Sequence, residues 1–186
     1  MRRVLFAIAA VGLLAAACGG AGGGAATTAP AAAKTTAAPT PQTVYVFTAD
    51  LSPANENPAV TDAEASGSGT STVTLTTTKD SAGKVTGATA KFEIVMKAFP
   101  TTTNLTISHI HKGDAKTNGP VVVDSGMKAD APIALTTGGT TITKDNLTVA
   151  ADLAIDIIAN PGNYYFNVHS QVHPGGIARA QLKAKS

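Results

Sequence analysis

The sequence is poor in aromatic, charged and sulfur-containing residues. Its 186 residues include no tryptophan, one cysteine and four histidines, and charged residues make up 14% of the chain. A single cysteine excludes an internal disulfide bond, so packing and hydrogen bonds must hold the fold together. Without Arg2 and Arg3, which belong to a leader segment, the 14 basic residues fall to 12 and equal the 12 acidic ones. A neutral chain without a basic stripe is not expected to bind nucleic acid.

The first 17 residues have the layout of a secretory signal peptide. The arginine pair forms a positive start, residues 4–14 are apolar, and three alanines precede Cys18. The segment is too short and wrongly flanked for a membrane-spanning helix. Ala-Ala-Ala-Cys is similar to a bacterial lipobox, in which the cysteine is lipidated, although Ala15 stands where Leu, Val or Ile is usual. The alternative is an ordinary signal peptide beside a free cysteine, and the export route, Sec or twin-arginine, stays open.

Residues 18–42 form a low-complexity stretch of Gly, Ala, Thr and Pro with a single charged residue. Such a composition cannot bury a core, so we expect a disordered tether. The order of lipid, spacer and domain predicts a protein of the bacterial cell envelope. It would be exported and held through its N-terminal lipid at the outer face of the cytoplasmic membrane.

Residues 43–186 have the length of one domain, and several segments alternate apolar and polar side chains. Strands are predicted at Thr43–Leu51, Ser68–Thr78, Gly87–Phe99, Asn104–His111, Pro120–Asp124, Ile133–Leu135, Tyr164–Ser170 and Ile177–Leu182. Residues 79–84 have the chemistry of a hairpin turn. Residues 150–162 carry apolar side chains at helical spacing, and a Pro-Gly pair should end that short helix. The pattern predicts an all-β fold, an antiparallel β-barrel or sandwich with one short helix.

Four ordered motifs resemble the CHRD domain, a module named after chordin and common in bacterial secreted proteins. The motifs are LSPANENPAV (51–60), ASGSGTSTVTL (65–75), HIHKGDAKTNGPVVV (109–123) and NYYFNVHSQVHPGGIARAQL (163–182). The resemblance implies an immunoglobulin-like β-barrel similar to that of copper–zinc superoxide dismutases. It implies little about activity, because one fold hosts many functions.

Four polar residues of these motifs are expected to brace the structure rather than to react: Asn55, Glu56, Asn167 and Arg179. We expect Arg179 to pair with a carboxylate. The closing motif departs from the family pattern Glu-Ile-Arg-Gly-Gln, because this chain reads Ile-Ala-Arg-Ala-Gln at residues 177–181. Any role of that glutamate is therefore absent here, whereas the arginine and glutamine remain.

All four histidines lie in two short stretches of the chain. His109 and His111 are two apart on a predicted strand, so their side chains share a face about 7 Å apart at the backbone. Neutral imidazoles so arranged are good ligands for copper or zinc. His169 is the third predicted ligand. His173 joins as a fourth only if residues 171–176 turn back, because four extended residues span about 13 Å.

Strand parity leaves a second interpretation open. On a regular strand Leu105, His109 and His111 share one face, so the imidazoles would continue an apolar stripe unless a bulge intervenes. The histidines would then form a structural network, bonded to backbone carbonyls or to Asn167.

The comparison with superoxide dismutases limits any site to one metal ion. The stretch HIHKGDAKTNG resembles the segment that carries the first copper ligands of those enzymes, but no histidine lies between His111 and His169 to bridge a second metal. Dismutase activity is therefore not expected. There is no seryl-hydrolase elbow and no phosphate loop, and Asp124 fits a solvated loop.

The sequence thus favours a non-enzymatic, lipid-anchored extracytoplasmic binding protein with at most one copper or zinc ion as cofactor. One alternative is a mononuclear copper or zinc protein with redox or metal-handling activity. Another is a structural or adhesive module that binds a further protein.

Overall fold

The computed structural model describes residues 40–185, so the expected signal peptide, Cys18 and nearly all of the tether lie outside the described residues. The elements are β1 (Gln42–Leu51), η1 (Pro53–Asn55), η2 (Ala63–Ser66), β2 (Ser68–Lys79), β3 (Val85–Lys97), β4 (Asn104–Lys112), β5 (Val121–Asp124), β6 (Ile133–Ala134), β7 (Thr140–Val149), α1 (Ala151–Ala159), η3 (Pro161–Asn163), β8 (Tyr164–Ser170), β9 (Ala178–Gln181) and β10 (Lys183–Ala184), where η marks a 3-10 helix. All eight predicted strands are present, with ends that differ by at most two residues.

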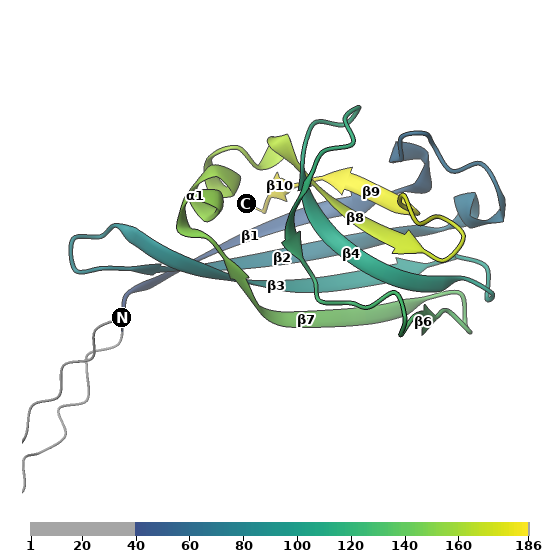
Figure 1. The fold of residues 1–186 in the computed structure, drawn as a ribbon, viewed down its shortest axis with the longest axis horizontal. Helices are drawn as coiled ribbons and strands as arrows, with labels where there is room; N and C mark the ends of the chain where they lie inside the picture. The colour runs from purple at the N-terminus through teal and green to yellow at the C-terminus, as the bar shows by residue number, and fades with distance from the viewer. Residues whose placement is uncertain (1–39, 186) are drawn as a thin grey trace, which may run out of the picture. The chain divides into compact units, whose positions relative to one another are not determined.

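The strands form two antiparallel sheets that pack face to face (Figure 1). The first sheet has the order β10-β1-β2-β3-β7, and the second has the order β5-β4-β8-β9 with the short β6 paired to β4. Between residues 40 and 185 an isolated bridge between Ser52 and Arg179 is the one β-bridge outside the named strands, and no continuous ladder joins the two sheets. The fold is therefore the predicted all-β sandwich, and the barrel alternative is wrong for this part of the chain.

The predicted alternation is clearest in β3. Phe92, Ile94 and Met96 point inward and are at most 1% exposed, whereas Glu93 and Lys97 face solvent. The inward residues build the core between the sheets, where the ring of Phe92 meets that of Phe166 from β8 edge to face at 5.0 Å. Each such side chain contributes about 1.5–3 kcal/mol through burial, so this layer fixes the sheets against each other.

The short helix is confirmed as α1, which crosses from the first sheet to the second between β7 and β8 (Figure 1). Ala154 and Ile157 are its buried residues, and the 3-10 turn η3 follows it directly. Neither α1 nor any other helix in residues 40–185 has the length and apolar character needed to cross a membrane.

Two strands lie outside the predicted segments: the two-residue strand β10 and the ten-residue strand β7. Only Ile142 and Val149 of its ten residues are buried, because β7 is an edge strand with one face in solvent. Asn146 adopts a positive φ of 56°, and the register against β3 shifts nearby. The irregularity breaks the period-two pattern on which the strand predictions rest.

A bulge in β4 decides where the histidines point. Leu105 pairs with Ser170 of β8, but Ser108 pairs with Val168, so β4 holds one extra residue between the two pairs. Beyond the bulge the faces are exchanged, and Ile110 takes the inward position that a regular strand would give to a histidine. The apolar-stripe interpretation is therefore wrong, and both histidines of β4 lie on the outer face of the second sheet.

Candidate metal centre

Three imidazoles meet on the outer face of the second sheet. His109 and His111 come from β4 and His169 comes from the neighbouring strand β8. Their ring centroids lie 5.2–6.2 Å apart, and one ring nitrogen of each lies within 4.8 Å of the other two. All three residues are buried although they face away from the core, because loops cover this face. We call this group the histidine trio.

Backbone carbonyls orient two of the three rings. His111 donates a hydrogen bond through Nδ1 to the carbonyl of Gly119 at 2.9 Å, and His169 donates through Nδ1 to the carbonyl of Pro174 at 2.9 Å. A carbonyl only accepts, so both rings carry their proton on Nδ1 and leave Nε2 unprotonated. This is the tautomer in which an imidazole binds a metal through Nε2.

A carboxylate orients the third ring. Nε2 of His109 lies 3.4 Å from Oδ2 of Asp124 on β5, the neighbouring strand. The remaining nitrogens, Nδ1 of His109 and Nε2 of His111 and His169, are buried without a hydrogen-bond partner among residues 40–185. Buried polar atoms are seldom left unpaired. Three of them in one cluster are the donor set that a metal ion requires.

Burial keeps the trio neutral. It lowers the pKa of His109 and of His111 below the usual 6.5, and it lowers that of His169 to about 4. Weaker effects oppose this shift, namely the charge of Asp124 on His109 and the carbonyl bonds of the other two rings. The neutral ring is the form in which an imidazole can ligate a metal, so the protonation state of the trio at neutral pH is compatible with metal binding.

A stack of side chains supports His111. Its ring lies flat on the ring of Tyr165, with the two centroids 4.8 Å apart. The guanidinium of Arg179 lies over the Tyr165 ring, 4.8 Å from its centroid. The phenol oxygen of Tyr165 accepts a hydrogen bond from the backbone N–H of Gly119 at 3.1 Å. A Cβ on Gly119 would overlap the carbonyl oxygen of Lys112, so only glycine lets the loop approach this closely.

Residues 47–182 match the family model of the CHRD domain. The chain belongs to the CHRD domain family. The span covers the four motifs and every strand from β2 to β9, so the resemblance is confirmed. No curated protein and no solved structure matches the chain.

The CHRD motif arginine, Arg179, fastens the loops around the trio. It donates from Nε to the carbonyl of Asn55 at 2.7 Å, from Nη1 to Oδ1 of Asn118 at 2.8 Å and from Nη2 to the carbonyl of Ala115 at 3.0 Å. The expected carboxylate partner is Glu56, but Oε2 lies 3.9 Å from Nε. Arg179 therefore acts mainly through hydrogen bonds to backbone carbonyls and to the side-chain amide of Asn118. These bonds join the segment that follows β1 to the loop after β4.

The CHRD motif glutamate, Glu56, lies buried beside the same arginine. Burial raises its pKa to about 7, although Arg179, His173 and a hydrogen bond from Asn167 act in the opposite direction. Gly176, with a φ of 139°, passes so close that a Cβ there would come within 2.6 Å of Glu56 Oε2. The second glycine of the His-Pro-Gly-Gly sequence thus makes room for this carboxylate.

His173 does not join the trio. The predicted turn forms, since the N–H of Ser170 and that of Gly176 both donate to the carbonyl of His173. The ring, however, points to two acidic residues of the segment before β2: Nδ1 donates to Glu64 at 2.7 Å, and Nε2 lies 3.4 Å from Asp62. We call this group the carboxylate clamp.

Sequence reasoning missed Asp124 and Gly119 as neighbours of the trio and both acids of the carboxylate clamp. Asp124 is 61% exposed, as a solvated residue would be, yet the β4–β5 register places it opposite His109. An antiparallel pairing of the predicted strands 104–111 and 120–124 is the sequence signal that could have suggested the contact between Asp124 and His109. Glu64 is 109 residues from His173, and no local pattern indicates that pair.

Proposed function

We propose that this CHRD domain protein is an extracytoplasmic metal-binding protein that holds one copper or zinc ion through His109, His111 and His169. The observation that carries the proposal is which ring nitrogens of the trio have a partner and which do not. Each ring has one nitrogen facing an oxygen acceptor and the other buried without a partner. A structural network would satisfy both nitrogens of each ring, so this arrangement supports the metal interpretation.

The donor set favours copper or zinc, because imidazole nitrogen suits both ions and carboxylates are absent from the trio. Three protein ligands leave a further coordination position open, as in sites where the metal meets a small molecule. Within residues 40–185 no second group of potential ligands accompanies the trio. The proposal is therefore a mononuclear site in a binding protein, without dismutase chemistry.

Metal analysis of the full-length protein, purified without a polyhistidine tag, tests this proposal. After incubation with Cu(II) or Zn(II) and removal of excess, the protein should retain one equivalent per chain. The double variant His109→Ala, His111→Ala should retain none. No saturable binding at micromolar metal would return the trio to a structural role, and binding that survives the double change would place the site elsewhere.

The proposal includes attachment to the outer face of the membrane through a lipid on Cys18. Its support is the sequence, in which an apolar leader and Ala-Ala-Ala precede this single cysteine. One acyl chain binds a bilayer only marginally, so stable attachment needs the several chains of a bacterial lipoprotein. A Cys18→Ser variant should leave the membrane fraction, whereas Ala25→Ser in the tether should not. Wild-type membrane levels of the Cys18→Ser protein would contradict the anchor.

A further inference from the structure

The side chains of His111 and Tyr165 are joined in two ways. The two residues pair across β4 and β8, and their rings stack with 6° between the ring planes. Each side chain also bonds to the backbone of Gly119: the phenol oxygen of Tyr165 accepts from its N–H at 3.1 Å, and Nδ1 of His111 donates to its carbonyl at 2.9 Å. Tyr165 therefore acts on His111 directly through the stack and indirectly through Gly119.

These two contacts restrict different motions of the imidazole. The stack sets the plane of the His111 ring, because tilting would separate the two ring faces. A half-turn about the Cβ–Cγ bond keeps that plane but moves both nitrogens, so the stack alone leaves the direction of Nε2 open. The hydrogen bond to Gly119 decides it, because this bond forms only when Nδ1 faces the carbonyl. The direction of Nε2, one of the unpartnered nitrogens of the trio, thus depends on where the Gly119 carbonyl lies.

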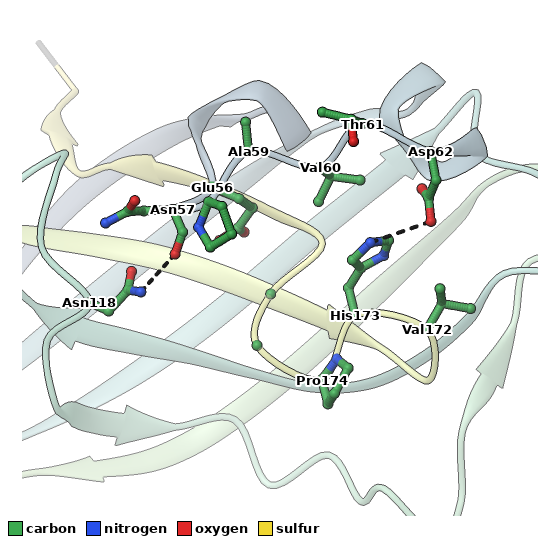
Figure 2. A pocket seen from close by; sticks show the side chains of 13 residues that line it. Glu56, Asn57, Ala59, Val60, Thr61, Asp62, Asn118, Val172, His173 and Pro174 are labelled. Carbon is green, nitrogen blue, oxygen red and sulfur yellow. Dashed lines mark hydrogen bonds and ion pairs between the residues drawn. The ribbon is translucent and has the colours of Figure 1, made fainter.

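Tyr165 in turn determines where the Gly119 carbonyl lies. Glycine has no side chain to limit its backbone torsions, so hydrogen bonds set the direction of its peptide groups. The preceding residue, Asn118, is held by contacts of its own: it donates to the carbonyl of Asn57 at 2.7 Å (Figure 2) and accepts from Arg179 at 2.8 Å. Within residues 40–185, the acceptor for the N–H of Gly119 is the phenol oxygen of Tyr165. This oxygen is therefore the contact that places Gly119 itself.

We propose that Tyr165 is a positioning residue of the metal centre: its ring fixes the plane of His111, and its hydroxyl fixes, through Gly119, the direction of Nε2. This role rests on the proposed function, because the site that it concerns is the histidine trio. A hydrogen bond to the second nitrogen of a ligating imidazole supports metal affinity, and Tyr165 extends that support by one residue. It does so for one ring only, since Nδ1 of His169 bonds to the carbonyl of Pro174 instead.

The first test compares Tyr165→Phe, which keeps the ring and removes the hydroxyl, with the wild type, as full-length proteins in a chelating buffer at neutral pH. The imidazole nitrogen resonances should show His111 of the wild type with its proton on Nδ1, and in Tyr165→Phe they should move toward the average of the two tautomers. His169 should keep its proton on Nδ1 in both proteins. Tyr164→Phe, the matched control, removes a hydroxyl bonded to Asp156 and should leave both rings unchanged. An unchanged His111 in Tyr165→Phe, or an equal change in Tyr164→Phe, would overturn the proposal.

The second test measures metal affinity by competition against a chelating dye. Tyr165→Phe should bind Zn(II) about tenfold more weakly than the wild type, at the lower end of the range for supporting contacts, because the stack remains. Tyr165→Leu also removes the stack and should bind about 100-fold more weakly. Tyr164→Phe should bind like the wild type. Absence of saturable binding in the wild type would contradict the proposed function, whereas equal binding by the wild type and folded Tyr165→Phe would overturn the role of Tyr165 alone.

Discussion

The histidine trio and His173 of the carboxylate clamp are in opposite chemical situations, although His169 of the trio and His173 are only four residues apart. In the trio, each imidazole has one nitrogen beside an oxygen acceptor and one buried nitrogen without a partner. In the carboxylate clamp, His173 faces a carboxylate with each of its nitrogens. The first arrangement leaves lone pairs available for a ligand, and the second uses both nitrogens to join the turn 171–176 to the segment before β2.

The comparison shows that the neighbours of an imidazole, rather than its position in a motif, decide what it can do. His169 and His173 are four residues apart and belong to one CHRD motif. The carbonyl of Pro174 accepts a hydrogen bond from the ring of His169. The ring of His173 instead lies between the carboxylates of Glu64 and Asp62. We therefore expect variants of the two groups to have separable effects, on metal affinity in the trio and on stability in the carboxylate clamp.

The largest expected effect is the loss of metal affinity in trio variants. His109→Ala, His111→Ala or His169→Ala should each lower the affinity for Cu(II) or Zn(II) by more than about 100-fold, because the loss of a supporting contact alone typically lowers it 10–100-fold. Competition against a chelating dye measures the affinity. His173→Ala is the matched control and should bind like the wild type. Equal losses in all four variants would erase the distinction between the two groups.

Substitution in the carboxylate clamp should lower stability instead. His173→Gln removes the ring that joins Glu64 and Asp62, and the buried Glu64 loses one of its hydrogen bonds. We expect the free energy of unfolding to fall by about 1–3 kcal/mol, with the metal stoichiometry unchanged. Urea denaturation of the metal-free protein measures the change. A stable His173→Gln protein that binds no metal would reverse the assignment.

Removing the carboxylate beside His109 should have a smaller effect on metal affinity. Asp124→Asn keeps the size of the side chain but removes the charge that favours one orientation of the ring. Because Asp124 is largely exposed, we expect a loss near the lower end of the range for supporting contacts, about tenfold. The same dye competition applies, with Asp130→Asn as control. An affinity equal to that of the control would show that Asp124 does not orient the ring.

The metal-free protein should show two opposite dependences of stability on pH. An unfolded imidazole titrates near 6.5, whereas burial lowers the pKa of His169 to about 4. Between these values the unfolded chain binds more protons, so this residue reduces the free energy of unfolding as pH falls. Burial raises the pKa of Glu56 from 4.5 to about 7, so the folded chain binds more protons in that window. Glu56 therefore reduces the free energy of unfolding as pH rises.

The variant Glu56→Gln separates the two dependences. The variant lacks the Glu56 contribution that lowers the free energy of unfolding as pH rises toward 7. The free energy of unfolding of Glu56→Gln should therefore rise more steeply between pH 5 and pH 7 than that of the wild type. Denaturation with urea at several pH values in a chelating buffer measures this, and Glu93→Gln on the exposed face of β3 is the control. Identical profiles for wild type and Glu56→Gln would show that burial does not raise the pKa of Glu56.

Much of the fold could be predicted because it follows from local alternation. β3 shows this best, since its apolar residues occupy every second position and its hairpin turn is marked by Asp80 and Gly83. β7 could not be predicted in the same way, because an edge strand with few buried residues and a positive φ at Asn146 lacks a regular pattern. Whether the sheets close into a barrel depends on long-range pairing, which period-two patterns do not encode.

The site was predictable in part for the same reason. The spacing of His109 and His111 places them on one face of β4, and that inference needs no tertiary information. Whether that face points toward the core or toward the outside depends on the bulge between Leu105 and Ser108. The bulge is visible only in the pairing of β4 with β8. The partners of His173 lie more than 100 residues away in the chain, so the sequence could suggest a turn there but not its contacts.

One measurement tests the distinction between the two groups most directly: the imidazole nitrogen resonances of the full-length protein during titration with Zn(II), which is diamagnetic. The geometry predicts that one equivalent shifts Nδ1 of His109 and Nε2 of both His111 and His169 to metal-bound values, while both nitrogens of His173 stay unchanged. Unchanged resonances of the trio at one equivalent, or a metal-bound shift of His173, would contradict the account.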